Sequence, residues 1–340
     1  MPVTSAISVD ESSILSQYCA MKVLLPDSFA FDLPLLRSLT TASGIEYVTY
    51  SGTCTDFSEH ADAEMLVLAM NSDACAQASV TQLPNLKLVQ TVAAGPDHLF
   101  ALGYNERISL ASGRGLHDIT VTEHALALTL ALVRNLDALH KAQLLHDWNQ
   151  EYIQGQATAA TESLYTLNKA KVLIYGFGSI AANLAPIFTT LGAQVSGVAQ
   201  SSGTRHGYPV IAANESKSAL QSADIVISLI PYTEASDKFF NTDFFNSMKK
   251  TSLFINVGRG KTVDESALID ALTNGKIRAA AIDVTAVEPL PKESPLWTTP
   301  NLTITPHVAG GRPRNSEELI AHNAMALSSG SQIRNLVSRS

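Results

Sequence analysis

Three ionisable side chains in the second half of the chain follow apolar runs that are typical of buried strands. Arg259 comes after LFINV, and His307 comes after LTIT. Glu288 lies five residues past Asp283, the acid of AAAIDV. Because the carboxyl ends of parallel strands converge on one crevice, these side chains can meet there. Taken singly, each also has a structural interpretation: a surface ion-pair partner, a turn residue before Pro289, or a loop histidine.

The chemistry of the three side chains suits proton and hydride transfer. Arg259 stays charged and can clamp a carboxylate or keto oxygen with two hydrogen bonds. His307 titrates near neutrality, so it can give or take the proton that accompanies hydride transfer. Glu288 can accept from the other ring nitrogen, which fixes the tautomer and favours the imidazolium. Jointly they form a candidate catalytic set.

A candidate nucleotide site precedes them, where the strand-like run KVLIY breaks into GFGSIA. A strand, then G-x-G-x-x-A, then a helix-like segment is the context that a dinucleotide fingerprint requires. Gly176 allows the tight turn, Gly178 lets the backbone approach a pyrophosphate, and Ala181 lets helix and strand pack closely. Ser179 and Ile180 begin the helix, whose N–H groups face the phosphates. An ordinary glycine-rich turn is the alternative.

The acid that would hold the ribose 2′-hydroxyl of NAD, at the end of the next strand, is absent. Gln200 stands at about its place, and Ser201, Ser202, Thr204 and Arg205 follow. Hydroxyls and a guanidinium suit a 2′-phosphate. We therefore expect an NAD(P) cofactor, with NADP(H) accepted.

Apolar runs alternate with helix-compatible stretches, which predicts an α/β fold with parallel sheets covered on both faces. The first part offers strands at 22–25, 46–50, 65–69, 86–92 and 108–111, and helices at 33–43 and 74–83. The second part offers strands at 172–175, 194–198, 225–229, 253–257, 279–284 and 302–305, and helices at 179–191, 242–249 and 265–274. Pro186 should kink or shorten its helix. The polar stretch 148–166 suits an irregular arm.

A long helix is expected at 122–136, apolar nearly all round and therefore buried in a core or an interface. His124 and His140 favour packing or solvent exposure over ligation. No H-x-x-x-H or C-x-x-C spacing supports a metal site. Earlier in the chain, the segment VQTVAAGPDHL ends a strand in a turn of small residues. There the N–H groups of Ala94 and Gly95 could hold a small carboxylate, although a plain strand-end turn fits equally.

Composition excludes several classes of function. The net charge of −8 is dispersed, which gives no footprint for nucleic acid or an anionic membrane. The longest apolar run, 125–133, is too short to span a bilayer. Three cysteines without metal spacing suit free thiols in a reducing cytoplasm. Residues 1–20 lack Lys and Arg and a long apolar core, so we expect a flexible extension and not a secretory signal.

The sequence resembles the D-isomer-specific 2-hydroxyacid dehydrogenase family. The resemblance rests on the blocks INVGRG, AIDVTAVEP and TPHVAGG in that order, supported by GFGSIA, DIVISLIPYTEAS and VTEHALAL. The segment AAGPDH resembles the substrate-carboxylate loop of glyoxylate/hydroxypyruvate reductase-like members. The likeness covers roughly residues 21–340.

The resemblance implies two domains with an active-site cleft between them. Residues 21–117 and 308–340 would form a flavodoxin-like substrate-binding (catalytic) domain. Residues 118–307 would form a Rossmann domain and a homodimer interface, with the apolar helix at 122–136 central to that interface. Arg259, Glu288 and His307 would be catalytic. Asp283 would lie near the nicotinamide, and the remaining cofactor contacts would be Ile230, Pro231, Val257, Gly258, His307 and Gly310.

The expected activity is hydride transfer between NAD(P) and a small 2-keto or D-2-hydroxy acid such as glyoxylate or hydroxypyruvate. His307 would be the general acid/base and Arg259 the carboxylate or carbonyl clamp. Two alternatives stay open: a dinucleotide-sensing regulatory protein on the same fold, and a dehydrogenase for a larger hydrophobic 2-keto acid.

Overall fold

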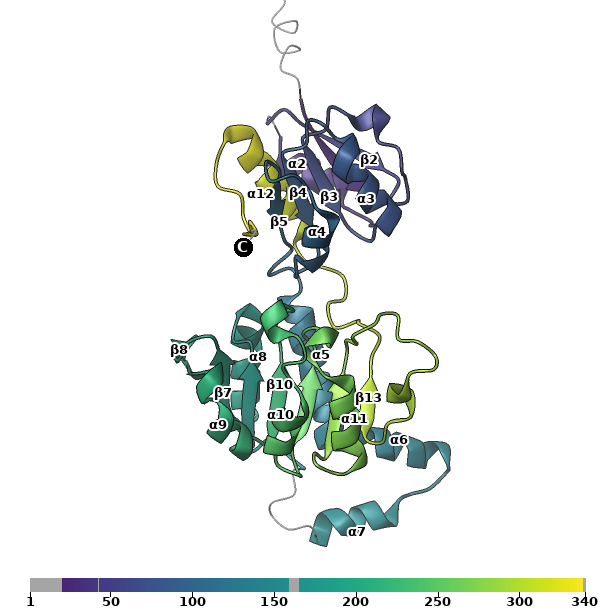
Figure 1. Cartoon of the computed structure of the whole chain (residues 1–340), viewed down its shortest axis with the longest axis vertical. Helices are drawn as coiled ribbons and strands as arrows, with labels where there is room; N and C mark the ends of the chain where they lie inside the picture. The colour runs from purple at the N-terminus through teal and green to yellow at the C-terminus, as the bar shows by residue number, and fades with distance from the viewer. Residues whose placement is uncertain (1–19, 42, 159–164, 339–340) are drawn as a thin grey trace, which may run out of the picture. The chain divides into compact units, whose positions relative to one another are not determined.

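The computed structural model describes residues 20–41, 43–158 and 165–338 (Figure 1). The chain divides into two compact units. One runs up to Leu116 and resumes at Pro313, and the other spans His117–Arg312. The limits expected from sequence were 117/118 and 307/308. The expected extension at 1–20 lies outside the described residues except for Ala20.

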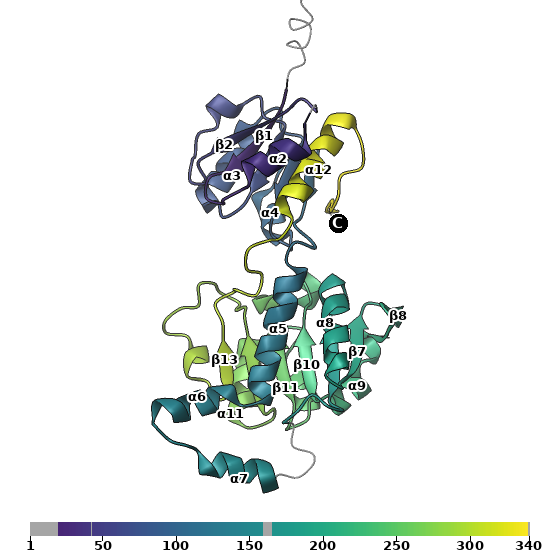
Figure 2. The same cartoon turned by 180° about the vertical axis from the view of Figure 1, so that it is seen from behind.

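The first unit is a five-stranded parallel sheet in the order β2-β1-β3-β4-β5, the flavodoxin-like order. Its strands are β1 (Met21–Pro26), β2 (Ile45–Tyr50), β3 (Met65–Leu68), β4 (Leu88–Thr91) and β5 (Ser109–Ala111). Its helices are α2 (Leu33–Leu39), α3 (Asp73–Gln82), α4 (Asp97–Leu102) and α12 (Ser316–Ser329). Side chains of α2 and α12 pack on one face and those of α3 and α4 on the other (Figures 1 and 2).

The second unit is an eight-stranded sheet in the order β13-β12-β11-β10-β6-β7-β9-β8. Its parallel strands are β6 (Lys171–Tyr175), β7 (Gln194–Ala199), β9 (Tyr208–Ala212), β10 (Ile225–Ser228), β11 (Leu253–Asn256), β12 (Ala279–Ile282) and β13 (Leu302–Ile304). β8 (Gly203–Arg205) runs antiparallel at the edge. The chain order reverses between β6 and β10, which is where such sheets bind nucleotides.

Helices cover both faces of this sheet. α5 (Asp118–Val133) and α8 (Ser179–Thr190) pack on one face, which is seen from the front in Figure 2. α9 (Lys217–Ser222), α10 (Thr242–Ser247) and α11 (Glu265–Thr273) pack on the other, seen in Figure 1. The central strands are buried along their whole length, which explains their continuous apolar runs. The expected α/β class, with a Rossmann-type sheet and a flavodoxin-like sheet, is confirmed.

One local expectation was wrong, and one element was not foreseen. The expected irregular arm contains a helix, α7 (Gln150–Thr158), and another, α6 (Leu136–Leu144), precedes it. The β8–β9 hairpin was not foreseen, since β8 has only three residues and Pro209 interrupts the apolar run of β9. Pro186 lies inside α8, which runs from Ser179 to Thr190, one residue short of the end expected from sequence; the expected kink stays a prediction. The expected helix at 122–136 is found as α5, which begins four residues earlier.

Candidate active site

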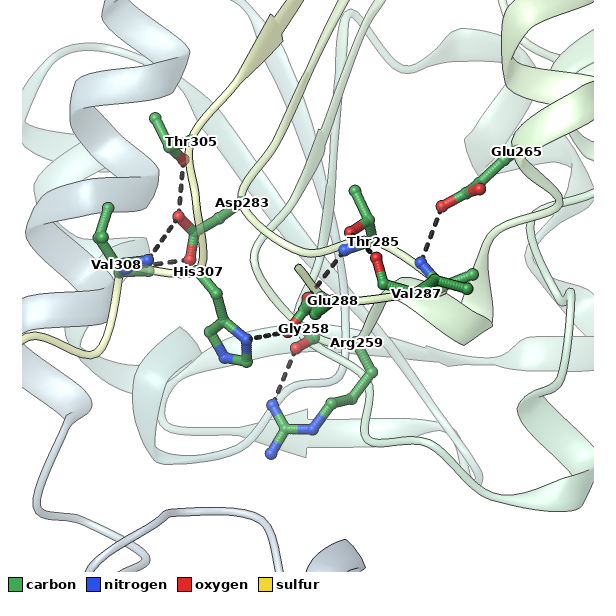
Figure 3. Close-up of polar contacts among 12 residues, drawn as sticks. Gly258, Arg259, Glu265, Asp283, Thr285, Val287, Glu288, Thr305, His307 and Val308 are labelled. Atoms are coloured by element: carbon green, nitrogen blue, oxygen red, sulfur yellow. Dashed lines mark hydrogen bonds and ion pairs between the residues drawn. The ribbon is translucent and has the colours of Figure 1, made fainter. Parts of the chain in front are cut away.

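The loop after β11 orients Arg259. Its backbone is held by Asn256, whose Nδ2 donates to the Arg259 carbonyl at 3.2 Å, while Thr262 Oγ1 donates to the same carbonyl at 2.6 Å. The guanidinium donates from Nη1 to the Gly258 carbonyl at 2.9 Å (Figure 3). Gly258 cannot carry a side chain here, because a Cβ would lie 2.7 Å from the Ile230 carbonyl oxygen.

The side chains of His307 and Glu288 form a hydrogen-bonded pair. His307 Nδ1 lies 2.6 Å from Glu288 Oε2, and Glu288 Oε1 accepts from the Thr285 amide at 2.9 Å. The carboxylate is therefore fixed by its own loop before it meets the imidazole. The pair is accessible, with side-chain exposures of 50% for His307 and 36% for Glu288. In Figure 3 the imidazole and the Arg259 guanidinium point to the same side.

Asp283, at the end of β12, binds the segment that carries His307. Its carbonyl accepts from the His307 amide at 2.7 Å. Its carboxylate accepts from Thr305 Oγ1 at 2.6 Å and from the amides of Val308 and Ala309, both at 2.9 Å. The side chain is 1% exposed, so these bonds replace its hydration. Asp283 thus acts on the loop on both sides of His307, which itself has a φ of +52°.

The fingerprint turn lies at the same edge of the sheet, between β6 and α8. Gly176 has a φ of +90°, and a Cβ there would lie 2.9 Å from the Leu229 carbonyl, so a side chain is excluded. Gly178 precedes the first turn of α8, which begins at Ser179. A Cβ on Gly178 would meet no other atom within 4 Å. Ala181 is fully buried. This geometry leaves the amide end of α8 open to a phosphate group.

The sequence-assigned cofactor residues of this unit gather at the carboxyl ends of its parallel strands. Apart from Gln200, Ser201, Ser202 and Arg205, which lie beyond β7, they follow β6, β10, β11, β12 and β13 in turn, and these strands pair side by side from β6 to β13. The set comprises Gly176, Gly178, Ser179, Ile180, Ile230, Pro231, Val257, Gly258, Asp283, His307 and Gly310.

Phe177, the middle residue of the fingerprint, packs its ring against the next strands. A Cβ on Gly197 of β7 would lie 2.2 Å from that ring, so only glycine fits beneath it. The ring centroid lies 6.0 Å from that of Tyr208 on β9. The hydroxyl of Tyr208 in turn lies 3.2 Å from Thr189 Oγ1 of α8. One aromatic side chain therefore connects the fingerprint turn with the β8–β9 hairpin.

The hairpin region divides the residues that we assigned to a 2′-phosphate. Arg205 Nη2 donates to the Ser201 hydroxyl at 3.0 Å and to its carbonyl at 3.3 Å, and Gln200 is exposed beside them. Ser202 has another partner, since its hydroxyl donates to Glu215 Oε2 at 3.0 Å and accepts from the Ala212 amide at 2.8 Å. The geometry favours Ser201 and Arg205 over Ser202 for phosphate binding.

Ala94 and Gly95 lie in the first unit, in the loop between β4 and α4. The loop is held at Ala93, whose carbonyl accepts from the Gly113 amide at 2.7 Å and whose amide donates to Thr91 Oγ1 at 3.1 Å. Both residues are partly exposed, as a small-carboxylate site requires.

The sequence pattern did not reveal the polar contacts of His124, on α5. Its Nε2 lies 3.0 Å from Thr305 Oγ1 and 3.4 Å from Asp283 Oδ1. Thr305 was likewise assigned no role. The available signal was position, because Thr305 ends a strand two residues before His307.

Within residues 20–41, 43–158 and 165–338, no cluster of three or more His, Cys, Asp or Glu side chains is arranged to hold a metal ion. In the same ranges, none of the helices has the length and apolar character needed to cross a membrane.

Comparison with known proteins places this arrangement in a family. Residues 126–309 match the family model described as "D-isomer specific 2-hydroxyacid dehydrogenase, NAD binding domain". Human glyoxylate reductase/hydroxypyruvate reductase is 32% identical over 249 residues, covering 70% of this chain and 73% of that protein. Glyoxylate/hydroxypyruvate reductase B of Klebsiella pneumoniae is 30% identical, covering 74% and 77%.

A similar solved structure is a D-isomer specific 2-hydroxyacid dehydrogenase family protein of Aeromonas salmonicida. It has a TM-score of 0.81 at 26% identity and covers 94% of this chain and 99% of its own. An NADPH-dependent glyoxylate/hydroxypyruvate reductase of Sinorhizobium meliloti, solved with NADP and sulfate, shares the fold with a TM-score of 0.75 at 22% identity, covering 94% and 98%. The chain belongs to the D-isomer-specific 2-hydroxyacid dehydrogenase family, whose members are NAD(P)-dependent oxidoreductases acting on CH–OH groups.

Proposed function

We propose that this protein reduces a small 2-keto acid of the glyoxylate or hydroxypyruvate type with NAD(P)H, and oxidises the matching D-2-hydroxy acid in reverse. The observation that carries the proposal is the His307–Glu288 pair beside Arg259, at the edge of the sheet that also carries the fingerprint. Names of relatives such as the human glyoxylate reductase/hydroxypyruvate reductase support the substrate class.

His307 is the proton donor in this proposal. When bound, reduced nicotinamide supplies the hydride. Glu288 accepts a hydrogen bond from Nδ1–H, so Nε2–H of the imidazolium points away from Glu288 and can give its proton to the substrate oxygen and take it back in the reverse direction. Glu288 stabilises the ring while it is charged.

Arg259 and the loop at Ala94–Gly95 bind the substrate. A guanidinium has donors enough for both the Gly258 carbonyl and a carboxylate or keto oxygen, and the Gly258 bond orients it in advance. The amides of Ala94 and Gly95 would hold the substrate carboxylate. An Arg259→Ala variant should have a lower kcat and a higher KM for the keto acid, because the clamp acts in the transition state and in the ground state.

The test of the reaction is His307→Ala, assayed by NADPH and NADH oxidation with glyoxylate and hydroxypyruvate. We expect kcat to fall by roughly 10²- to 10⁴-fold, whereas the Kd for the cofactor should stay unchanged. His140→Ala, which alters an exposed histidine on α6, is the matched control. A wild type that binds cofactor but turns over no 2-keto acid would refute the proposal and favour a dinucleotide-sensing regulator.

For the cofactor, we propose that NADP(H) is accepted through Ser201 and Arg205. Arg205→Ala should raise KM for NADPH about tenfold and leave KM for NADH within about twofold, because the contact exists only with a 2′-phosphate. The counterpart Ser202→Ala should change neither, since Glu215 already engages that hydroxyl. A large kcat/KM advantage for NADH in the wild type would overturn this assignment.

We also propose a homodimer, formed through α6 and α7. Large apolar side chains are exposed at the end of α6 and in the segment that joins it to α7: Leu144, Leu145 and Trp148, at 68%, 79% and 81% exposure. A groove of about 730 Å³ lies between the two helices. Light scattering should show a dimer for the wild type and a shift toward monomer for Trp148→Glu.

The free thiols Cys54 and Cys75 support a cytoplasmic location.

A further inference from the structure

The hydroxyl of Thr305 has one proton, and its contacts determine where that proton goes. Asp283 Oδ1, at 2.6 Å, belongs to a carboxylate that also accepts from two backbone amides, so it accepts from Thr305 as well (Figure 3). The hydroxyl oxygen must then accept from His124 Nε2, at 3.0 Å. His124 therefore carries a proton on Nε2, and a directed chain runs from His124 through Thr305 to Asp283.

The end of this chain is the backbone around His307. Asp283 accepts from Thr305 on one side of His307 and from the amides of Val308 and Ala309 on the other. The imidazole of His307 is half exposed, and Glu288 is a side chain on a separate loop. The direction in which His307 leaves the sheet is thus set by Asp283, through a backbone in the left-handed region.

The first turns of α5 hold the same segment from the other side. His117, Thr120 and His124 recur three and four residues apart, so they share one face of the helix. His117 Nδ1 lies 2.9 Å from the Gly310 carbonyl, and Thr120 Oγ1 donates to that carbonyl at 2.6 Å. The face of α5 that ends in His124 therefore contacts both ends of the His307 segment.

We propose that Thr305 and His124 are positioning residues for the general acid His307. They act through Asp283, whose buried carboxylate they help to solvate, and they need not touch substrate. This inference rests on the proposed role of His307. It assigns to His124 a function that its position on an apolar helix does not suggest.

The experiment compares variants that remove the hydrogen-bonding groups with variants that keep them. Thr305→Val keeps the shape and loses the hydroxyl, whereas Thr305→Ser keeps it. His124→Leu loses the donor, whereas His124→Gln keeps an N–H donor that cannot be charged. Thr299→Val removes a threonine hydroxyl that bonds a carbonyl elsewhere, at Pro295, and is the control. Activities are measured on holoenzyme per NADPH-binding site.

We expect Thr305→Val and His124→Leu each to lower kcat about 10- to 100-fold, the usual scale for residues that orient a reacting group through another. The Kd for NADPH should hold within about twofold, and Thr305→Ser and His124→Gln should recover kcat to within about threefold. The double variant Thr305→Val/His124→Leu should be no worse than the lower single variant, because the two lie on one path.

Three results would overturn the inference: full kcat in Thr305→Val or His124→Leu, additive losses in the double variant, or no recovery in the conservative pair. His307→Ala separates this from the proposed reaction. If His307→Ala is inactive and Thr305→Val is fully active, the positioning inference alone fails. If His307→Ala is active, the proposed function fails. Should Thr305→Val not bind NADPH, the His124→Leu and His124→Gln pair decides.

Discussion

Replacing Gly260 by alanine should damage the His307–Glu288 pair without touching either residue. Gly260 begins the short helix after Arg259 and is fully packed against the chain at Thr285. A Cβ on Gly260 would lie 2.0 Å from both the carbonyl carbon and the oxygen of Thr285. Because those atoms are backbone, the methyl cannot be accommodated by a side-chain rotation.

The size of the effect follows from these distances. Ordinary contact begins at 3.4 Å, so the Thr285 backbone must move by about 1.4 Å. The Thr285 amide donates to Glu288 Oε1 at 2.9 Å, and the carboxylate would follow it away from His307. A displacement of about 1 Å at a reacting group costs about 100-fold in rate. Overpacking of this kind also costs about 1–3 kcal/mol of unfolding free energy.

The assay is steady-state NADPH oxidation with glyoxylate, together with urea unfolding and cofactor titration. We expect kcat near one hundredth of wild type, a lower unfolding midpoint and an unchanged Kd for NADPH. Gly155→Ala on α7 is the matched control, because a Cβ there meets nothing within 4 Å. If Gly260→Ala keeps wild-type kcat, the Thr285 loop does not position Glu288 and the reasoning is refuted.

Three further predictions concern separate groups. Glu288→Gln keeps an acceptor for Thr285 but removes the charge beside His307, so kcat should fall about 10- to 100-fold, and wild-type kcat would contradict this. Burial, with a smaller contribution from the neighbouring Cys75 thiol, raises the pKa of Cys54 to about 11. Iodoacetamide should therefore alkylate Cys54 about 100-fold more slowly than free cysteine at pH 8. The alkylation rate should rise about tenfold per pH unit up to pH 10, and a pH-independent rate would contradict this prediction. Arg278→Met removes donors to Asn135 and the Leu132 carbonyl at the end of α5, so urea unfolding should show a loss of about 1–3 kcal/mol; an unchanged midpoint would argue that the bonds are not net stabilising.

Much of the fold could be predicted because its strands are continuous apolar runs. The run at 225–229 became β10, and 253–257 became β11, each within one residue. Such runs signal a strand buried on both faces, and glycine turns mark where it ends. The candidate catalytic residues were found for the same reason, since each follows a run of this kind.

What the sequence concealed depends on contacts between distant residues. β8 has only three residues, and Pro209 interrupts β9. Their two-residue turn at His206–Gly207 has φ values of +50° and +82°, as in a type I′ turn, but it lacks the Asn-Gly or Asp-Gly pair that usually marks such a turn in sequence. α7 lacks a clear apolar period, so its nine residues resembled a loop. The hydrogen bonds of Thr305 could not be predicted either, because its partners His124 and Asp283 come from elements far apart in sequence.

The packing of Phe177 has a consequence for how this sequence can evolve. The second position of a G-x-G turn is formally unrestricted, yet here its ring occupies the space above Gly197 and contacts Tyr208. A larger residue at 197 is therefore tolerated only after 177 has become small, and a small residue at 177 removes the ring that Tyr208 contacts. Positions 177, 197 and 208 should change together among descendants of this sequence, so the turn that faces the pyrophosphate and the hairpin that would face the 2′-phosphate are inherited as one unit.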